Sequence, residues 1–386
     1  MSEFRTIREL CSVVVDCPHS TPKWTANGKI VIRNKNIKHG KIDFSSPSYT
    51  DDEHFAQRIK RAKPQPGDII ITREAPIGDV GMIPENTECC LGQRMVLLRA
   101  NQSVCDNFYL LYSLQSLYVQ HQISWSEGTG TTVSNLRIPH LEQIQIPYLP
   151  LEQQAKISSV LRALEEKIEN NRRLNDNLQQ QAAALFSSLY DRTNTEVRFT
   201  DLIQILGGGT PKTGENTYWN GNIAFFTPKD VGTPYTLITE KTITEEGLSH
   251  CNSRLYPVNT VFVTARGTVG KVGMSGVPMA MNQSCYALVG KETHQFLVYF
   301  YTLKAVDRLK HKASGAVFDA ITTRDFESEQ IMKLSDDDAK AFLCIAEPMF
   351  QKVLNNCIEN LRLSTLRDSL LPKLMSGEVD VSAVQL

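Results

Sequence analysis

Several features are missing from this chain, and each absence argues against a class of protein. The nine cysteines include no Cys-x-x-Cys pair, so we expect neither a disulfide framework nor a bound metal. No apolar run reaches the ~18 residues needed to cross a bilayer. We therefore expect a globular cytoplasmic protein of 386 residues, long enough for two domains.

Catalytic motifs are missing as well. The stretch GGGTPKTGENTYWNG (207–221) has the glycine spacing of a phosphate-binding loop, but Glu215 stands where that motif requires lysine. The Asn/Asp-Pro-Pro-Tyr/Phe loop of amino-methyltransferases does not occur, and neither a nuclease-like acidic cluster nor a Ser/His/Asp set stands out. We expect a non-catalytic protein that binds no cofactor itself. An enzyme with an unrecognised motif stays open as an alternative.

The chain does contain an internal repeat. Short motifs of its first half recur in its second half, in the same order and at shifts of 185 to 192 residues. The matched pairs are Thr21-Pro22-Lys23 with Thr210-Pro211-Lys212, IGDVGM (77–82) with VGKVGM (269–274), Gln93 with Gln283, and Gly130 with Gly315. We infer a duplicated protein.

The clearest part of the repeat is helical. Apolar residues recur at alternating steps of four and three from Ile157 to Leu189, and the same pattern recurs 185 residues later. Asparagines interrupt the two patterns at matching positions, Asn171 and Asn175 in the first and Asn356 and Asn360 in the second. We predict that the two helices pack against each other, with the asparagines setting their register.

The ends of the second helix are marked. Ser335 and Asp338 form a capping-box pattern, and Gly377 can end the helix. Pro348 and Pro372 oppose a regular helix, so we expect it to be kinked or broken near each proline.

These patterns define four segments: a first globular domain (1–150), a central spacer helix (151–192), a second globular domain (193–334) and a C-terminal spacer helix (335–386). Strand-like runs such as GDIIITRE (67–74) and NTVFVTAR (259–266) alternate with turn residues. We predict a mixed α/β (α+β) fold in each domain, a coiled coil between the long helices, and a pseudo-two-fold repeat.

Basic residues are clustered although the net charge is only -1. Residues 17–42 hold six lysines and arginines and no acidic residue, and the second half has a corresponding set of basic loops. Such loops favour contact with DNA phosphates and base edges. The predicted DNA-binding residues are Lys23, Arg33, Asn34, Lys35, Asn36, Arg58, Arg61, Arg73, Thr210, Lys212, Thr213, Lys229, Arg266, Lys310 and Lys312.

Four stretches together resemble one family, the specificity subunits of type I restriction-modification systems. They are GGGTPKTGENTYWNGNIAFFTPKDVG (207–232), the IGDVGM and VGKVGM pair, PLEQQAKISSVLRALEEKIENNRRLNDNL (150–178) and LRDSLLPKLMSGEVDV (366–381). The first half offers only HSTPKWTANGK (19–29) in place of the full GGTP and YWNG form. We therefore expect the two domains to read different DNA half-sites. The resemblance implies that residues 1–150 and 193–334 are target-recognition domains, held apart by the two long helices as an antiparallel coiled coil.

The resemblance implies partners that the residues alone do not indicate. They are double-stranded DNA with a bipartite target, two modification subunits that carry S-adenosylmethionine and methylate adenine, and restriction subunits that act as ATP-driven motor and nuclease. The net charge agrees with this, because such a chain should hold DNA weakly without partners. A coiled-coil scaffold without a DNA role is the second alternative.

Overall fold

A computed structural model of the chain describes residues 3–38, 40–125, 135–232, 234–312, 320–382 and 384. The matched glycines Gly130 and Gly315 lie outside these ranges. The chain divides into two compact units: the first comprises Met1–Glu166 and Leu363–Leu386, and the second comprises Lys167–Arg362. Within the described ranges, no helix is both long and apolar enough to cross a membrane.

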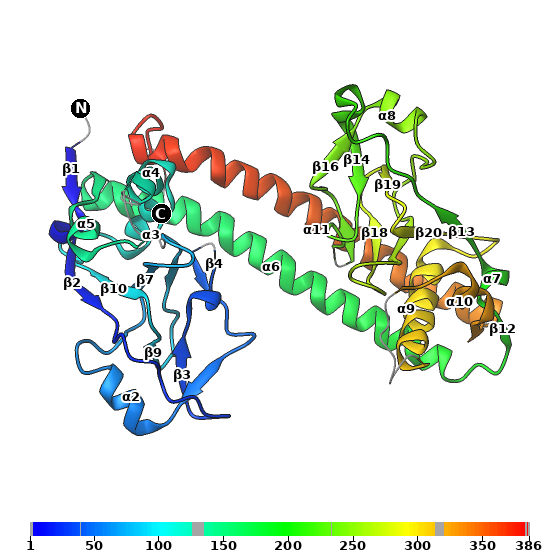
Figure 1. Ribbon diagram of the computed structural model, residues 1–386, viewed down its shortest axis with the longest axis horizontal. Helices are drawn as coiled ribbons and strands as arrows, with labels where there is room; N and C mark the ends of the chain where they lie inside the picture. Colours follow the sequence, from blue (N-terminus) through cyan, green and yellow to red (C-terminus); the bar gives the residue numbers. More distant parts are fainter. Residues whose placement is uncertain are drawn as a thin grey trace. The chain divides into compact units, whose positions relative to one another are not determined.

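The first unit contains two main sheets (Figure 1). Its strands are β1 (Glu3–Thr6), β2 (Cys11–Asp16), β3 (Lys29–Ile32), β4 (Ile37–Lys38), β5 (Lys41–Ile42), β6 (Ser48–Thr50), β7 (Ile69–Thr72), β8 (Val80–Met82), β9 (Cys89–Leu91), β10 (Met95–Ala100) and β11 (Gln145–Tyr148). One sheet is antiparallel with the order β2-β10-β7-β8. The other has the order β6-β3-β9, with β3 parallel to β9.

Helices pack against both sheets of the first unit, with Phe55 against the β6-β3-β9 sheet and most of the other helices against the antiparallel sheet. The helices are α1 (Ile7–Leu10), α2 (Asp52–Arg58), α3 (Asn107–Gln115), α4 (Leu117–Trp125) and α5 (Ile138–Gln143), with the short 3-10 helix η1 (Asn34–Asn36). Side chains of a strand alternate between its two faces, so Ile69 and Ile71 join the core formed with the helices while Ile70 joins the core shared with β3 and β9. This explains why β7 reads as an unbroken isoleucine run.

The second unit has the same plan. Its strands are β12 (Glu196–Arg198), β13 (Ile203–Gly207), β14 (Trp219–Phe226), β15 (Tyr235–Thr236), β16 (Lys241–Ile243), β17 (Val261–Thr264), β18 (Val272–Ser275), β19 (Met279–Met281), β20 (Cys285–Gly290) and β21 (Gln330–Met332). Its helices are α7 (Phe199–Leu202), η2 (Asn216–Tyr218), α8 (Glu245–Ser249), α9 (Gln295–Lys312) and α10 (Thr323–Ser328). The orders β13-β20-β17-β18-β15 and β16-β14-β19, with β14 parallel to β19, repeat those of the first unit, and β15 is an additional edge strand.

Individual backbone hydrogen bonds repeat too. Gly92 N–H donates to the Ile32 carbonyl at 2.7 Å, and Asn282 N–H donates to the Phe226 carbonyl at 3.0 Å. The bond from Arg73 N–H to the Arg94 carbonyl, 2.8 Å, has its counterpart from Ala265 N–H to the Ser284 carbonyl, also 2.8 Å. The mixed α/β class and the internal duplication are confirmed, and these bonds align the two halves residue by residue.

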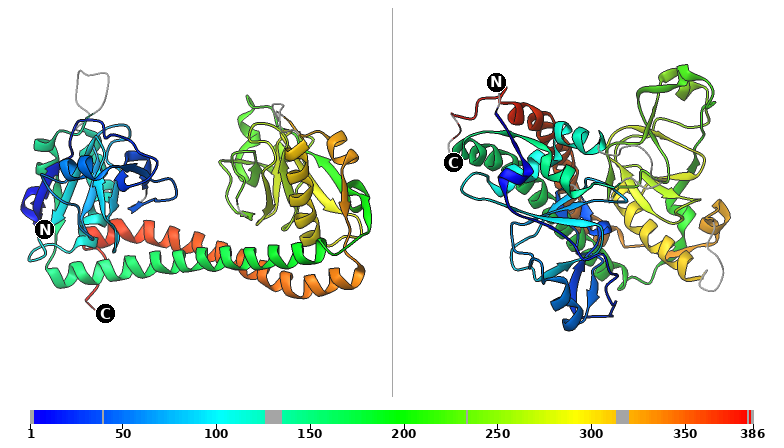
Figure 2. Two further views of the ribbon diagram at one scale, coloured as in Figure 1. Left: turned by 90° about the horizontal axis from the view of Figure 1, so that it is seen from below. Right: turned by 60° about the vertical axis from the view of Figure 1, so that its left-hand side comes forward.

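The two long helices are α6 (Leu151–Tyr190) and α11 (Asp336–Ser376). In the second unit they run antiparallel side by side, α6 in green and α11 in orange (Figure 2), and asparagines join them. Asn356 Nδ2 donates to Asn175 Oδ1 at 2.8 Å, and Asn171 Nδ2 donates to Asn360 Oδ1 at 2.9 Å. In the first unit, Arg367 of α11 pairs with Glu165 of α6 at 3.6 Å. Every position of both heptad patterns is buried or partly buried.

The helix α11 is continuous through Pro348 and Pro372, so the expected break near each proline does not occur. Both prolines are exposed, and at such positions water can replace the backbone hydrogen bonds that proline cannot make. The predicted ends are present. Ser335 Oγ accepts from Asp338 N–H at 3.1 Å, and Gly377 follows the last turn with a φ of 74°.

Candidate nucleic-acid interface

Four loops of the first unit come together at the ends of its strands. We call residues 16–24, 33–36, 73–78 and 92–94 the first loop cluster. Gln93 Nε2 donates to the His19 carbonyl, and Asn34 Nδ2 donates to the Glu74 carbonyl at 2.6 Å. With the bond from Arg73 N–H to the Arg94 carbonyl, these contacts tie all four loops together.

The corresponding loops of the second unit, residues 207–219, 227–230, 265–270 and 282–284, form the second loop cluster. Here Thr210 Oγ1 lies 2.5 Å from Gln283 Oε1, the contact that corresponds to Gln93 with His19. Thr268 Oγ1 donates to the Pro228 carbonyl at 3.3 Å. A matched glutamine therefore ties down the Thr-Pro-Lys loop of each unit.

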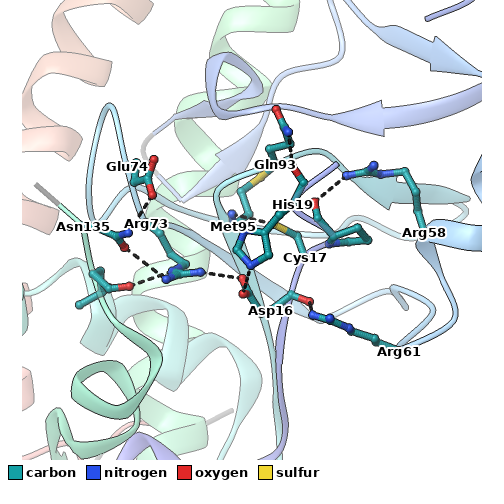
Figure 3. Close-up of polar contacts among 12 residues, drawn as sticks. Asp16, Cys17, His19, Arg58, Arg61, Arg73, Glu74, Gln93, Met95 and Asn135 are labelled. Carbon is teal, nitrogen blue, oxygen red and sulfur yellow. Dashed lines mark hydrogen bonds and ion pairs between the residues drawn. The ribbon is translucent and has the colours of Figure 1, made fainter. Parts of the chain in front are cut away.

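Arg73 is the centre of a polar network beneath the first loop cluster (Figure 3). Its guanidinium donates to Asp16 Oδ1 at 2.9 Å, to the Leu136 carbonyl at 2.8 Å and to Asn135 Oδ1 at 3.2 Å. Asp16 also pairs with His19 at 2.9 Å. The prediction that Arg73 contacts DNA is therefore not supported, because its donors are used inside the domain.

Arg58 and Asn36 need the same correction. Arg58 is 6% exposed and donates to the carbonyls of Leu91, Ser20 and Pro18 at 2.7, 2.9 and 3.1 Å. Asn36 is buried, accepts from the Arg33 N–H and donates to the Asp43 carbonyl. Lys312 lies 2.5 Å from Glu329, a carboxylate with no exposed surface, but the Lys312 side chain is 55% exposed, so its contact with DNA stays a prediction. These groups hold the domains together because leaving such partners unpaired would be costly.

The other predicted residues of the first unit face solvent. Lys23, Arg33, Lys35 and Arg61 are exposed and Asn34 is partly buried. Arg61 donates to the Asp16 carbonyl at a long 3.4 Å, and Lys35 Nζ donates to Ser46 Oγ at 3.1 Å. The Arg33 guanidinium lies over the exposed Trp24 ring, 5.0 Å from its centre. The structure thus brings Lys23, Arg33, Asn34 and Lys35 into one cluster.

In the second unit Lys212, Thr213, Lys229, Arg266 and Lys310 are exposed, and Thr210 is partly buried. Two aromatic residues brace the glycine-rich loop. Trp219 Nε1 donates to the Lys212 carbonyl at 3.2 Å, and the Tyr218 ring stacks on His250 at 4.9 Å. Lys229 lies 3.5 Å from Glu240 with an exposed side chain, so this pairing is weak.

Acidic groups near the first loop cluster are held ionised. A backbone hydrogen bond from His54, with a smaller contribution from Lys23, lowers the pKa of Asp51 to about 2. The ammonium groups of Lys29 and Lys63 lower the pKa of Glu88 to about 2. These carboxylates offset Lys23, Lys29 and Lys63 in part. Arg33, in contrast, forms no ion pair with any described residue.

Sequence reasoning missed Arg94 and the hollow beside it. A cavity of about 340 Å³ is lined by Pro22, Trp24, Arg33, Asn34, Lys35, Ala75, Gly92, Gln93 and Arg94. Arg94 has a φ of 66° and pairs with Glu74 at 3.2 Å. The sequence offered one signal for Arg94, namely that it directly follows Gln93, which is matched by Gln283 in the repeat.

A family model described as the type I restriction modification DNA specificity domain matches the chain twice, over residues 3–180 and 192–333. The chain belongs to this family of DNA specificity domains. Its two matches contain the two loop clusters, one each.

Relatives in the family are similar over much of the chain. The type I restriction enzyme MjaIX specificity subunit of Methanocaldococcus jannaschii is 23% identical over 342 residues, which cover 82% of this chain and 78% of that protein. The HindI specificity subunit of Haemophilus influenzae is 28% identical over 186 residues, which cover 47% and 40%. The crystal structure of the type I restriction-modification S subunit from M. genitalium has a TM-score of 0.62 at 18% identity, covering 97% of this chain and 96% of that one. This structural likeness supports the same fold for the specificity-domain pair.

Proposed function

We propose that this specificity protein reads a bipartite DNA target, each loop cluster contacting one half of it. The observation that carries the proposal is two matched pairs of lysines. Lys23 and Lys35 in the first loop cluster correspond to Lys212 and Lys229 in the second, and all four are exposed. The phosphate backbone of DNA is the same whatever the base sequence. A lysine present at the equivalent position in both domains is therefore expected to contact a phosphate, even if the two domains read different bases.

In this proposal the chain is non-catalytic and works within a complex. Its net charge of -1 limits the affinity that it can reach alone, because affinity rises with the number of phosphates neutralised. Two modification subunits carrying S-adenosylmethionine dock on the paired helices, and restriction subunits supply ATP-driven cleavage. The length of the helices sets the spacer between the two half-sites. Membership of the family supports these roles.

The test is co-expression of the chain with its modification partner, followed by mapping of methylated bases. We expect adenine methylation within a split sequence motif. A continuous motif, or no methylation with an assembled complex, would overturn the proposal.

The lysines can be tested in the same complex with the double variant Lys23→Glu, Lys35→Glu. If both contact phosphates, DNA affinity falls and the slope of log affinity against log salt decreases by about 2, since each contact contributes about 0.9. The control is Arg8→Glu, which reverses an exposed charge in α1 of the same unit, outside the loop cluster. An unchanged salt slope in the double variant would contradict phosphate contact.

A further inference from the structure

The two loop clusters keep the same backbone framework while some of their side chains change. The Arg33 N–H donates to Asn36 Oδ1 at 3.0 Å, and at the corresponding turn Thr227 N–H donates to Asp230 Oδ2 at 2.8 Å. Together with the repeated bonds at Gly92 and Asn282, this shows that Arg33 and Thr227 occupy equivalent positions in the two units. The repeated bonds of Arg73 and Ala265 likewise show that Glu74 and Arg266 occupy equivalent positions.

Some positions are kept between the clusters and others differ. Lysine is kept at 23 and 212 and at 35 and 229, and glutamine at 93 and 283. The positions that differ include Trp24 and Thr213, Arg33 and Thr227, Glu74 and Arg266, and Arg94 and Ser284. Phosphates are alike and bases are not, so base-reading residues are expected among the positions that differ.

Arg33 has the properties of a base-reading side chain. It is exposed, has no ion-pair partner among the described residues, and is oriented by the Trp24 ring. It shares the 340 Å³ hollow with Lys35 and Arg94, so the charged side chains there are all hydrogen-bond donors. The nearby carboxylate of Glu74 is occupied by Arg94 and Asn135.

The wall of this hollow is also held in an unusual backbone conformation. Ala75 and Arg94, neither of them glycine, have φ values of 44° and 66°. Such residues are kept in the left-handed region where the surrounding structure requires it, often at ligand sites. This observation is independent of the charge pattern.

In the second loop cluster the exposed arginine comes from another loop. Position 227 is threonine, and Arg266 stands at the place of Glu74. Among the described residues Arg266 has no ion-pair partner either, and its backbone N–H donates to the Ser284 carbonyl at 3.3 Å. Each cluster therefore offers one unpaired arginine, but from a different loop.

Building on the proposed function, we propose that Arg33 and Arg266 are specificity-determining residues, each reading one guanine in the half-site of its own domain. Guanine presents two acceptors, O6 and N7, on its major-groove edge, and an arginine fork can bond both. Because the two arginines stand on different loops, the guanine occupies a different place in each half-site.

The experiment uses the complex with the modification partner and a DNA panel in which each base of the mapped target is changed in turn. For Arg33→Ala we expect the preference for guanine at one position of one half-site to fall by roughly 5- to 150-fold. Preferences in the other half-site stay unchanged. Arg266→Ala should give the reciprocal result, so each variant is the control for the other.

Two further variants separate base reading from phosphate contact. Lys35→Ala should weaken methylation of all sequences alike, and Thr227→Ala should leave the guanine preference assigned to Arg33 unchanged. If Arg33→Ala and Arg266→Ala instead weaken all sequences alike, or leave the split motif unaltered, the assignment is wrong while the proposed function stands. If the wild-type complex yields no split motif, the proposed function itself fails.

Discussion

At the scale of the residue, the environment of an arginine decides its role. Arg58 and Arg73 stand in basic stretches of the sequence, yet both donate to partners inside the first domain. Arg33 has the same side chain but meets an aromatic face and solvent. The five N–H donors of a guanidinium can bond loop carbonyls or bind a ligand. A buried arginine does the first, and an exposed one is free to do the second.

Arg58 gives a stability prediction. Arg58→Ala would leave three carbonyls without their donor, and we expect the free energy of unfolding of the first domain to fall by about 2–4 kcal/mol. Denaturant unfolding measures this. Arg61→Ala is the control and should change stability by less than about 0.5 kcal/mol. If Arg58→Ala has wild-type stability but binds DNA more weakly, Arg58 contacts DNA, as predicted from the sequence.

At the scale of the element, the asparagine pairs set how α6 and α11 meet. Asn356 has no exposed surface, and a buried amide needs a partner. In an antiparallel pair, Asn175 meets Asn356 in one register, because a shift along the helices would leave an amide against an apolar side chain. The pairs therefore cost some stability and provide register.

We predict that Asn356→Leu lowers the free energy of unfolding by about 1–3 kcal/mol, because the side-chain oxygen of Asn175 loses its donor. The double variant Asn175→Leu, Asn356→Leu should recover this loss or exceed wild-type stability. A double-mutant cycle of unfolding free energies measures the coupling. The control is Asn355→Leu, at the neighbouring exposed position. An equal loss of unfolding free energy in that variant would show that the Asn175–Asn356 pair has no special role.

At the scale of the whole molecule, continuous helices join two copies of one domain. The helix α6 has 40 residues and α11 has 41, and each contributes to both compact units. A change in helix length therefore changes the length of the helical connection between the two units.

Removing one heptad from each helix, residues 168–174 and 357–363, tests this. The deletion keeps Asn175 opposite Asn356 and shortens each helix by about 10 Å, which corresponds to about three base pairs of DNA. We expect the spacer of the methylated motif to shorten, or assembly to fail. An active complex with an unchanged spacer would show that helix length does not set it.

The sequence by itself determined the duplication, the two long helices and their asparagine register, because heptads and repeated motifs are local patterns that need no knowledge of the fold. It also indicated which loops carry basic residues. Tertiary structure alone decided which of those residues face solvent. Arg33 and Arg58 read alike in sequence, but packing against Leu91, Ser20 and Pro18 buries Arg58 and leaves Arg33 exposed beside Trp24. Burial depends on residues distant in the chain, which no local pattern records.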